Sequence, residues 1–520
     1  MNALTDSYPK LGALSLRQCL VLAAVASLLL RAWIAYAFPI TGDEAFFYWW
    51  GVYLDWGYYD HPPMVGWMIG LMRALFGDTQ FAVRLPAVVL PLLVGGLVYW
   101  AFAPLSRERA SWAVLLYWLT PLSWLNALVT TDTPLVFWST LSVALLVRAQ
   151  RPGVPARKRM PWLAGAGLSL GLAFLSKYFA VVLGLTYLVY FAVARRTQWK
   201  ELLWLVVWAL PGALINLGFN YSHGWPNIMF NLFNRNEGAE FAVKKPVGFV
   251  LLILYMATPF VLWHLARARA TLRSQWQAVL GSGHVLVYLV VVPLVFFALL
   301  SAKKTIGLHW ILSFYPYVFV LAAMALPMAR LRSLGLGLAG FLALHLVAVL
   351  VLSMTRLDDW RSNHFYQEIV QGFRTEAVVS ASGPSGPVIM ADAYNAAALY
   401  GFATRTYVPV FGLGRFHARQ DDLLVDFSRY QGKTIRVLLM KPPAMEDYAP
   451  YFRSVRQWAY QQDGAEFYAV EGEGFDYAAY QQGVQQKILH DFYRIPGWLP
   501  MSGCPFCERL CGTTRCGVSR

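Results

Sequence analysis

The sequence predicts a mainly helical membrane protein that crosses the bilayer many times and continues into a smaller soluble domain of mixed helices and strands. Two observations carry this prediction. Hydrophobic residues make up 58% of the 520 residues and charged residues only 14%, a balance typical of polytopic membrane proteins. Apolar segments close to the roughly 20 residues needed to cross a bilayer also recur as far as residue 354.

We expect about eleven spans, at residues 17–38, 82–103, 111–129, 133–148, 161–175, 178–194, 202–220, 247–265, 281–300, 308–327 and 334–354. The first segment lacks a small-residue cleavage site, so we expect a retained span rather than a signal peptide. The fifth and sixth segments are short, and the polar pair Ser176 and Lys177 separates them. We interpret these two segments as a hairpin, with a single kinked helix as the alternative.

Basic residues gather in short connections between the spans, and the formal net charge is +15. The connections that carry most of them are 107–109, 148–159, 195–200, 267–273 and 330–332. With eleven spans, these fall on every second connection, so the positive-inside rule places all of them in the cytoplasm. The N-terminus is then inside and the C-terminal region outside the plasma (inner) membrane. The charge therefore indicates topology rather than binding of nucleic acid.

The composition changes near Thr355 to that of a soluble protein. Apolar runs at 387–390 and 435–440 indicate buried strands, and 395–402 has the spacing of a short helix. Turns are marked by Gly383, Pro384, Gly386 and Pro387. We expect a transmembrane domain at 1–354 with an acidic first outer loop at 39–81, an extracytoplasmic mixed α/β domain at 355–485, and a cysteine-containing tail at 486–520.

Four of the five cysteines lie in this tail, at Cys504, Cys507, Cys511 and Cys516. Their spacing could bind zinc, although zinc modules usually separate two cysteine pairs by a longer loop. An extracytoplasmic tail favours paired disulfides, because that compartment oxidises thiols. An incidental disordered tail is the third alternative, and we assign no catalytic role to the tail.

The loop from Thr41 to Pro63 combines carboxylates with many aromatic rings. Asp43 and Glu44 stand directly after the first span, where a carboxylate could act as general base for an acceptor hydroxyl. The alternative is that Asp43 only caps a helix starting at Glu44. Aromatic rings bind lipid interfaces and sugars, which makes Tyr58 and Tyr59 candidate substrate contacts.

Asp60 and His61 precede two prolines, which fix the backbone where the loop returns to the bilayer. Asp60 could orient a metal, an acceptor or a partner base. The alternative is a turn in which Asp60 caps and His61 faces water.

Asp132 lies in a tight polar corner between two spans, where a buried aspartate should have a partner. It could also cap the span that begins at Pro134.

The basic candidates on the predicted outer face are Lys177, Lys303, Lys304 and His309. Lysines there could neutralise a lipid phosphate, whose charge rises as a glycosyl bond breaks. The alternatives are lysines that snorkel at helix ends and a histidine that is merely interfacial.

Taken in order, these elements are GDE at 42–44, YDHPP at 59–63, TDTP at 131–134, SK at 176–177, and KK at 303–304 followed by YP at 315–316. As an ordered set they resemble the GT-C glycosyltransferases, most closely the branch of the protein O-mannosyltransferases and the lipid A aminoarabinose transferases. The resemblance covers roughly residues 17–354. The soluble domain fits in position but carries no family signature.

The resemblance implies an inverting transfer of a sugar from a polyprenyl phosphate to a lipid, glycan or protein acceptor on the outer face. It implies that Asp43 is the catalytic aspartate beside Glu44, and that Asp60 and Asp132 line the same cavity. It places Lys177 and Lys303 or Lys304 near the donor phosphate. The chain departs from the aminoarabinose transferases at one motif, where they have Glu-Lys-Pro and this chain has Asp60, His61 and Pro62. The replacement of that lysine by His61 weakens any inference about the same sugar or the same phosphate contact.

The chemistry agrees with this interpretation, because a charge-neutralised phosphate leaves without a general acid. A hydroxyl acceptor would need Asp43 as base, whereas a phosphate acceptor would not, and the sequence leaves both open. No cofactor is certain; several outer carboxylates are compatible with a divalent metal, but their spacing matches no defined metal site.

Two other functions stay open. A lipid-linked sugar flippase should show repeats or charges deeper within several spans, and an O-antigen ligase or polymerase usually has a large late outer loop.

Overall fold

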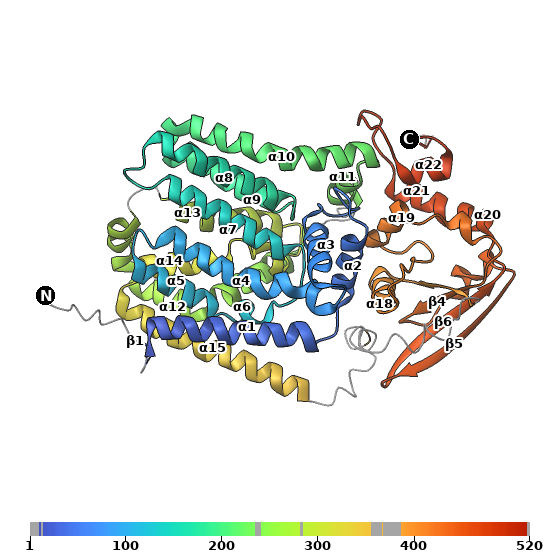
Figure 1. Cartoon of the computed structure of the whole chain (residues 1–520), viewed down its shortest axis with the longest axis horizontal. Coiled ribbons are helices and arrows are strands. Elements are labelled where there is room, and N and C mark those ends of the chain that lie inside the picture. The colour runs from blue at the N-terminus through green and yellow to red at the C-terminus, as the bar shows by residue number, and fades with distance from the viewer. Residues whose placement is uncertain are drawn as a thin grey trace. The chain divides into compact units, whose positions relative to one another are not determined.

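The computed structural model describes residues 10–11, 14–234, 241–280, 284–354, 367 and 386–516, and most of these are helical (Figure 1). Contacts divide the chain into two compact units. The helical unit comprises 1–37, 83–213 and 239–354, and the sheet unit comprises 38–82, 214–238 and 355–520. The predicted domain boundaries at 354 and 485 stay predictions, and the turn signals at Gly383 and Pro384 lie outside the described residues.

The elements up to residue 354 are the short strands β1 (Lys10–Leu11) and β2 (Leu14–Ser15) and the helices α1 (Leu16–Ala37), α2 (Gly42–Val52), α3 (Met64–Phe76), α4 (Gln80–Phe102), α5 (Arg107–Trp118), α6 (Pro121–Leu125), α7 (Asp132–Ala149), α8 (Ala156–Phe174), α9 (Ala180–Ala194), η1 (Arg196–Gln198), α10 (Trp199–His223), α11 (Pro226–Ile228), η2 (Met229–Phe233), α12 (Lys244–Leu280), α13 (Val285–Ser301), η4 (Leu308–Ile311), α14 (Tyr315–Ala325) and α15 (Met328–Met354).

Each of the eleven predicted apolar segments coincides with one of these helices or with a consecutive pair. Within the described residues, five helices are by themselves long and apolar enough to cross a membrane: Leu16–Ala37, Gln80–Phe102, Arg196–His223, Lys244–Ala270 and Met328–Val351. The predicted class, a mainly helical polytopic membrane protein, is therefore confirmed. The number of spans stays a prediction.

The two short segments around Lys177 form a hairpin, as predicted. Ser142 on α7 donates a hydrogen bond to the carbonyl of Ala166 on α8 and also contacts the hydroxyl of Tyr187 on α9, at 2.7 and 2.9 Å. A single helix would separate residues 166 and 187 by about 30 Å. Both can reach one side chain only because the chain turns back between α8 and α9.

Helix α12 differs from its prediction, because it continues through the connection expected at 267–273. It also contains a kink. Thr258 has φ 59° and ψ 144°, and Pro259 follows it. Proline cannot donate the helical hydrogen bond, so the break falls at this pair.

Two buried arginines of the helical unit donate hydrogen bonds to backbone carbonyls. Arg31 on α1 donates to Ala87 O at 2.9 Å, the carbonyl that loses its helical partner because Pro91 has no N–H. Arg109 donates to Ala323 O and Leu326 O at 2.7 and 2.8 Å, at the end of α14. Arg109, which the sequence suggested only as a topology signal, therefore also caps a helix.

The elements after residue 385 are β3 (Val388–Ala391), α18 (Tyr394–Thr404), η6 (Phe416–Gln420), α19 (Asp421–Leu424), η7 (Phe427–Tyr430), β4 (Ile435–Leu439), η8 (Met445–Asp447), η9 (Ala449–Tyr451), β5 (Ser454–Gln462), β6 (Ala465–Glu473), α20 (Tyr477–Tyr480), η10 (Gln481–Gln485), α21 (Gln486–Phe492) and α22 (Pro505–Cys511). The strands and helix predicted at 387–390, 435–440 and 395–402 are confirmed as β3, β4 and α18.

One four-stranded sheet orders these strands β3-β4-β6-β5. Strands β3 and β4 pair in parallel, with Val388 opposite Ile435, and the other pairs are antiparallel. Strands β5 and β6 form a hairpin, since Gln462 pairs with Ala465 across Asp463 and Gly464. Both turn residues have positive φ, the conformation that an Asp-Gly turn of type I′ requires.

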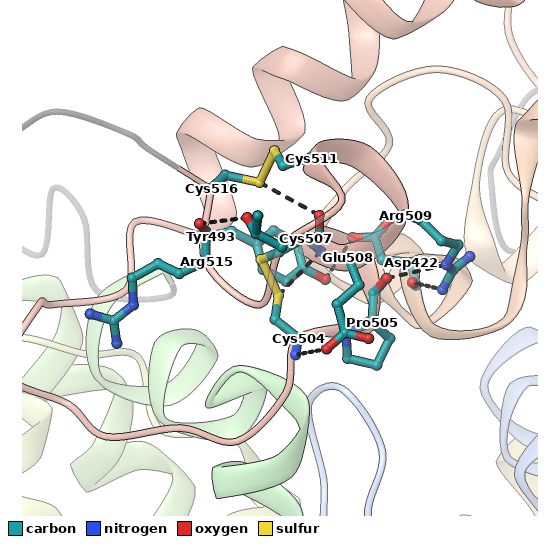
Figure 2. Close-up of a disulfide and its surroundings, with 11 residues drawn as sticks. Asp422, Tyr493, Cys504, Pro505, Cys507, Glu508, Arg509, Cys511, Arg515 and Cys516 are labelled. Atoms are coloured by element: carbon teal, nitrogen blue, oxygen red, sulfur yellow. Dashed lines mark hydrogen bonds between the residues drawn. A yellow bond between two sulfur atoms is a disulfide. The ribbon is translucent and has the colours of Figure 1, made fainter.

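The tail carries two disulfides, Cys504–Cys507 and Cys511–Cys516, as Figure 2 shows. This outcome favours the disulfide interpretation over the zinc site and the disordered tail. The tail also packs into the sheet unit, because Cys504 and Cys507 are buried in its hydrophobic core. Arg509 on α22 donates hydrogen bonds to the carbonyls of Asp422 and Val425.

Candidate functional site

Helix α2 presents Asp43 at its exposed surface. The cap of α2 is made by Thr41 and Glu44: the Glu44 carboxylate accepts from the Thr41 backbone N–H at 3.1 Å, and the Thr41 hydroxyl accepts from Glu44 N. The alternative role of Asp43 as the helix cap is therefore wrong. Glu44 is fully buried and its carboxylate serves the cap, while Asp43 stays available for other contacts.

Asp60 is 1% exposed and lies between two histidines of the sheet unit. His417 donates from Nδ1 to Asp60 Oδ2 at 2.5 Å, and His61 Nδ1 lies 3.2 Å from the same oxygen. Burial by itself would raise the pKa of Asp60, but the charges and hydrogen bonds of the two histidines hold it well below its usual value. Asp60 is thus no exposed turn cap. Its other oxygen, Oδ1, has no hydrogen-bond partner among the described residues.

Tyr394 and His417 connect Asp60 with Asp43. The Tyr394 hydroxyl donates to Asp43 Oδ1 at 2.8 Å, and the ring of Tyr394 lies 4.6 Å from the ring of His417, centroid to centroid. Phe46 packs edge-on against both rings, at 5.1 and 6.1 Å. We call Asp43, Asp60, Tyr394 and His417 the carboxylate cluster.

Tyr58 and Tyr59 are both 1% exposed. The Tyr58 hydroxyl donates to Trp50 O at 2.6 Å, and its ring stacks on Trp50 at 4.4 Å. The Tyr59 backbone N–H donates to Gln420 Oε1 at 2.9 Å. These contacts hold the loop that carries Asp60, and a direct contact of either ring with substrate stays a prediction.

Asp132 and Lys177 form a buried ion pair in the helical unit, with Lys177 Nζ 2.6 Å from Asp132 Oδ2. The partner predicted for a buried Asp132 is therefore Lys177. Asp132 is the first residue of α7 and makes no capping bond, and Lys177 is buried rather than snorkelling. Asp132 Oδ1 has no hydrogen-bond partner among the described residues.

Lys303 and Lys304 follow the end of α13, and Lys245 Nζ donates to Lys303 O at 2.9 Å. This contact brings the pair Lys244 and Lys245, at the start of α12, to the end of α13. We call these four residues the lysine cluster. His309 is exposed on the neighbouring η4.

An apolar cavity of about 180 Å³ lies between α12, α13 and α14. Its lining on α12 runs from Phe249, one helical turn after Lys245, across the kink at Thr258 to Leu265. The other walls come from side chains such as Pro293 and Phe314. The cavity thus starts beside the lysine cluster and is lined almost entirely by hydrocarbon.

No group of three or more His, Cys, Asp or Glu side chains is arranged to hold a metal ion in the part of the chain that the structure describes. Asp60 and its two histidines come nearest by residue type, but both histidines lie against the same carboxylate oxygen, Oδ2, as ion-pair partners. The geometry therefore gives no support to the divalent metal considered from the sequence.

The sequence pointed to Asp43, Asp60, Asp132 and Lys177 but missed Tyr394, His417, Lys244 and Lys245. No spacing pattern could have found His417, because 357 residues separate it from Asp60. The lysine pair at 244–245 could have been found from the sequence, because it lies at the edge of an apolar segment as the pair at 303–304 does. A single cavity lined by Asp43, Asp60 and Asp132 stays a prediction.

Comparison with known proteins places the chain among membrane glycosyltransferases. A family model described as dolichyl-phosphate-mannose-protein mannosyltransferase matches residues 60–217. The lipid A galacturonosyltransferase of Rhizobium johnstonii is 28% identical over 257 residues, which are 45% of this chain and 51% of that protein. The undecaprenyl phosphate-alpha-4-amino-4-deoxy-L-arabinose arabinosyl transferase of Pseudomonas aeruginosa is 30% identical over 166 residues, 30% of this chain and 29% of that protein. The chain thus matches about half or less of the length of these curated relatives.

The fold is similar to that of ArnT from Cupriavidus metallidurans, solved with bound undecaprenyl phosphate. The TM-score is 0.62 at 16% identity, over 86% of this chain and 97% of that chain. An identity this low shows the fold alone, but the family model and the sequence relatives agree with it. The family model, the sequence relatives and the fold together support a glycosyltransferase of the GT-C superfamily, similar to the branch that includes the aminoarabinose transferases.

Proposed function

We propose that the protein transfers a sugar from a polyprenyl phosphate donor to a lipid acceptor on the outer face of the inner membrane. The observation that carries this proposal is the apolar cavity of the helical unit with the lysine cluster at one end. A polyprenyl phosphate matches this arrangement of apolar and charged parts, because it is a long hydrocarbon chain that ends in a charged phosphate. The cavity would hold part of the chain, and the lysines would face the phosphate.

Lysines at this position would favour the bond-breaking step. When the bond between the anomeric carbon and the phosphate oxygen breaks, the electron pair stays on the phosphate and its negative charge increases. Ammonium groups stabilise that charge, and more so where water is excluded. No protonation of the leaving group is then required.

The carboxylate cluster would serve the acceptor. With a hydroxyl acceptor, Asp43 takes the proton as the oxygen attacks the anomeric carbon on the face opposite the phosphate. Tyr394 occupies Asp43 Oδ1, and Oδ2 faces no hydrogen-bond donor among the described residues, so Oδ2 is the oxygen available for this proton. With a phosphate acceptor, which already carries negative charge, Asp43 would orient rather than deprotonate.

The names of the relatives support a lipid acceptor and a polyprenyl phosphate donor. One relative is named for lipid A and another for undecaprenyl phosphate. Neither name describes a flippase, an O-antigen ligase or a polymerase, so these alternatives gain no support. The sugar itself is left open, because the departure at His61 falls in one of the motifs that carry the resemblance.

Transfer in isolated membranes tests the proposal. Membranes that contain the wild-type protein or Asp43→Asn are supplied with radiolabelled polyprenyl phosphate sugars, and labelled lipid is separated by chromatography. We expect labelled lipid with the wild type and at least a ~100-fold slower rate with D43N if the acceptor is a hydroxyl. Asp55→Asn is the matched control, since Asp55 lies in the same loop but outside the carboxylate cluster.

A second variant tests the donor side. We expect K303M/K304M to lose transfer while the protein still accumulates in the membrane. Normal transfer by this variant would remove the lysine cluster from the donor site. No labelled acceptor with the wild type, while labelled donor still crosses the bilayer, would favour a flippase instead.

A further inference from the structure

Two side chains of the C-terminal segment reach the carboxylates of the first loop. Tyr394 belongs to α18 and His417 to η6, whereas Asp43 and Asp60 lie 351 and 357 residues earlier in the chain. We propose that Tyr394 and His417 are positioning residues, which orient Asp43 and Asp60 for the transfer reaction. This inference rests on the function proposed above.

Tyr394 fixes the rotation of the Asp43 carboxylate. Asp43 is exposed on α2, so without a partner its side chain would sample several rotamers. The hydrogen bond of 2.8 Å from the Tyr394 hydroxyl to Oδ1 selects one orientation. Tyr394 itself is held, because its ring packs against those of Phe46 and His417.

His417 fixes Asp60 in an ionised state inside the protein. Burying an ionised carboxylate that is only 1% exposed costs free energy unless the charge has a partner. His417, which donates a hydrogen bond from Nδ1, and His61 are the two partners of Asp60. The backbone beside Asp60 is held from the same element, since Gln420 on η6 accepts from Tyr59 N. One short segment, η6, therefore sets both the backbone and the side chain at this position.

The two positions are coupled through a ring contact. Tyr394 and His417 lie 4.6 Å apart, centroid to centroid, so a shift of one ring displaces the other. Asp43 and Asp60 are thus linked by a series of three contacts: Asp43 with Tyr394, Tyr394 with His417, and His417 with Asp60. The C-terminal segment would act in this way on the reaction without touching the reacting atoms.

The variants Tyr394→Phe and His417→Phe separate positioning from packing, because each keeps a ring and removes only the polar contact. Matched controls exist in the same unit. Tyr468→Phe removes a hydroxyl that donates to Glu466 at 2.6 Å, and His490→Phe removes a histidine that pairs with Asp491 at 2.9 Å. Neither Tyr468 nor His490 contacts the carboxylate cluster in the described structure.

Steady-state transfer by the full-length protein in membranes gives the first readout. We expect Y394F and H417F to lower kcat by about 10- to 100-fold with KM within about twofold of the wild type, since a small misplacement of a reacting group has that effect. We expect the two controls to match the wild type. The double variant should lose less than the product of the two single losses, because the positions are coupled.

The pH profile gives a second readout that a packing role would not change. Besides His417, the titratable groups that face Asp60 are His61 beside it and Tyr59 before it. Burial raises the pKa of Asp60 and the two histidines lower it, so removal of His417 moves this pKa upward while His61 still lowers it. The acidic limb of the transfer rate should therefore move to higher pH in H417F and stay in place in Y394F.

Amide hydrogen exchange gives a third readout, which requires no activity. We expect faster exchange in peptides from 42–62 in both variants, with unchanged exchange in β4 and β6 and no change in the controls. If exchange rises in this way but the wild type transfers no sugar, the proposed function fails and the positioning of the carboxylates stands. Unchanged exchange with unchanged kcat would overturn the inference, and so would faster exchange throughout the sheet unit, which shows packing alone.

Discussion

Asp132 and Lys177 illustrate how a single ion pair can be required without adding much stability. Both side chains are less than 10% exposed, and their charged atoms lie 2.6 Å apart. Removing one partner leaves a buried charge without compensation, which typically costs about 3–5 kcal/mol, whereas replacing both can be nearly neutral.

We therefore predict that Asp132→Asn and Lys177→Met each lower the unfolding temperature more than the double variant does, measured by thermal unfolding in detergent. The exposed pair of Arg429 and Asp426, at 3.4 Å, is the control, and R429M should change stability by less than about 1 kcal/mol. A double variant as unstable as the sum of the single variants would show that the pair is not the relevant interaction.

The lowered pKa of Asp60 predicts how the free energy of unfolding depends on pH. The two histidines hold its pKa in the folded state below the unfolded value of about 4. A lowered pKa means that the stabilising contribution is present above about pH 4 and is lost as the pH falls from there towards the folded value. Asp60→Asn removes this contribution at every pH.

The expected result is a gap in unfolding temperature between the wild type and D60N that is constant from about pH 5 to 6 and narrows below about pH 4. Thermal unfolding across this range and down to about pH 3 measures it. The control is Asp491→Asn, which removes an exposed carboxylate beside His490. A gap that stays constant down to the lowest pH would contradict the low pKa of Asp60.

At the scale of elements, glycine determines how closely α8 and α10 approach each other. A Cβ on Gly167 would lie 2.1 Å from Leu205 O, and one on Gly212 would lie 2.4 Å from Gly171 O. Small residues at helix contacts are typical of membrane proteins, because packing drives helix association there.

Gly167→Ala should therefore force the two helices apart and destabilise the protein by about 1–3 kcal/mol. Gly96→Ala is the matched control within α4, where an added Cβ meets nothing within 4 Å. Unfolding temperatures in detergent distinguish the two variants. Equal temperatures for G167A and the wild type would show that α8 and α10 do not pack this closely.

The tail is a second element with a testable structure. Its two disulfides close short loops, with sequence separations of 3 and 5. Loops of this size stabilise by about 2 kcal/mol each in the chain-entropy model. We expect reductant to lower the unfolding temperature of the wild type and to leave a variant with all four tail cysteines replaced by serine unchanged.

Mass spectrometry after alkylation maps the same pairs. In the unreduced, denatured protein, only Cys19 should be alkylated, because the structure gives it no disulfide partner. Alkylation of any tail cysteine without reductant would contradict the assigned pairs.

For the whole molecule, the alternation of basic connections predicts which side of the membrane each loop faces. Cysteine substitutions in a Cys19→Ser background test this, with the tail disulfides left intact. Leu54→Cys lies in the loop predicted outside and Arg157→Cys in a basic connection predicted inside, and both native side chains are exposed. An impermeant maleimide should label L54C in intact cells and R157C only after permeabilisation. The reverse pattern would place the first loop in the cytoplasm and exclude a reaction on the outer face.

Length, hydropathy and residue spacing were enough to predict the class of the protein, the positions of its helices and four polar residues that the structure buries or places in clusters. Length and hydropathy of each segment are local properties, so the apolar helices up to α15 could be located without knowledge of their neighbours. Asp132 could be expected to have a partner because burying a lone charge in a membrane is costly, whatever the fold. The disulfide interpretation of the tail followed from compartment chemistry.

Which residues contact one another could be read from the folded chain alone. In the structure Thr41 and Glu44, not Asp43, cap α2, and Asp132 forms an ion pair with Lys177, which is 45 residues away. The fold also brings Tyr394 and His417 to the first loop, which no periodicity could indicate because the contacts span 351 and 357 residues. Patterns along a chain report the faces of single elements, whereas partners across hundreds of residues are fixed by the packing of the folded chain.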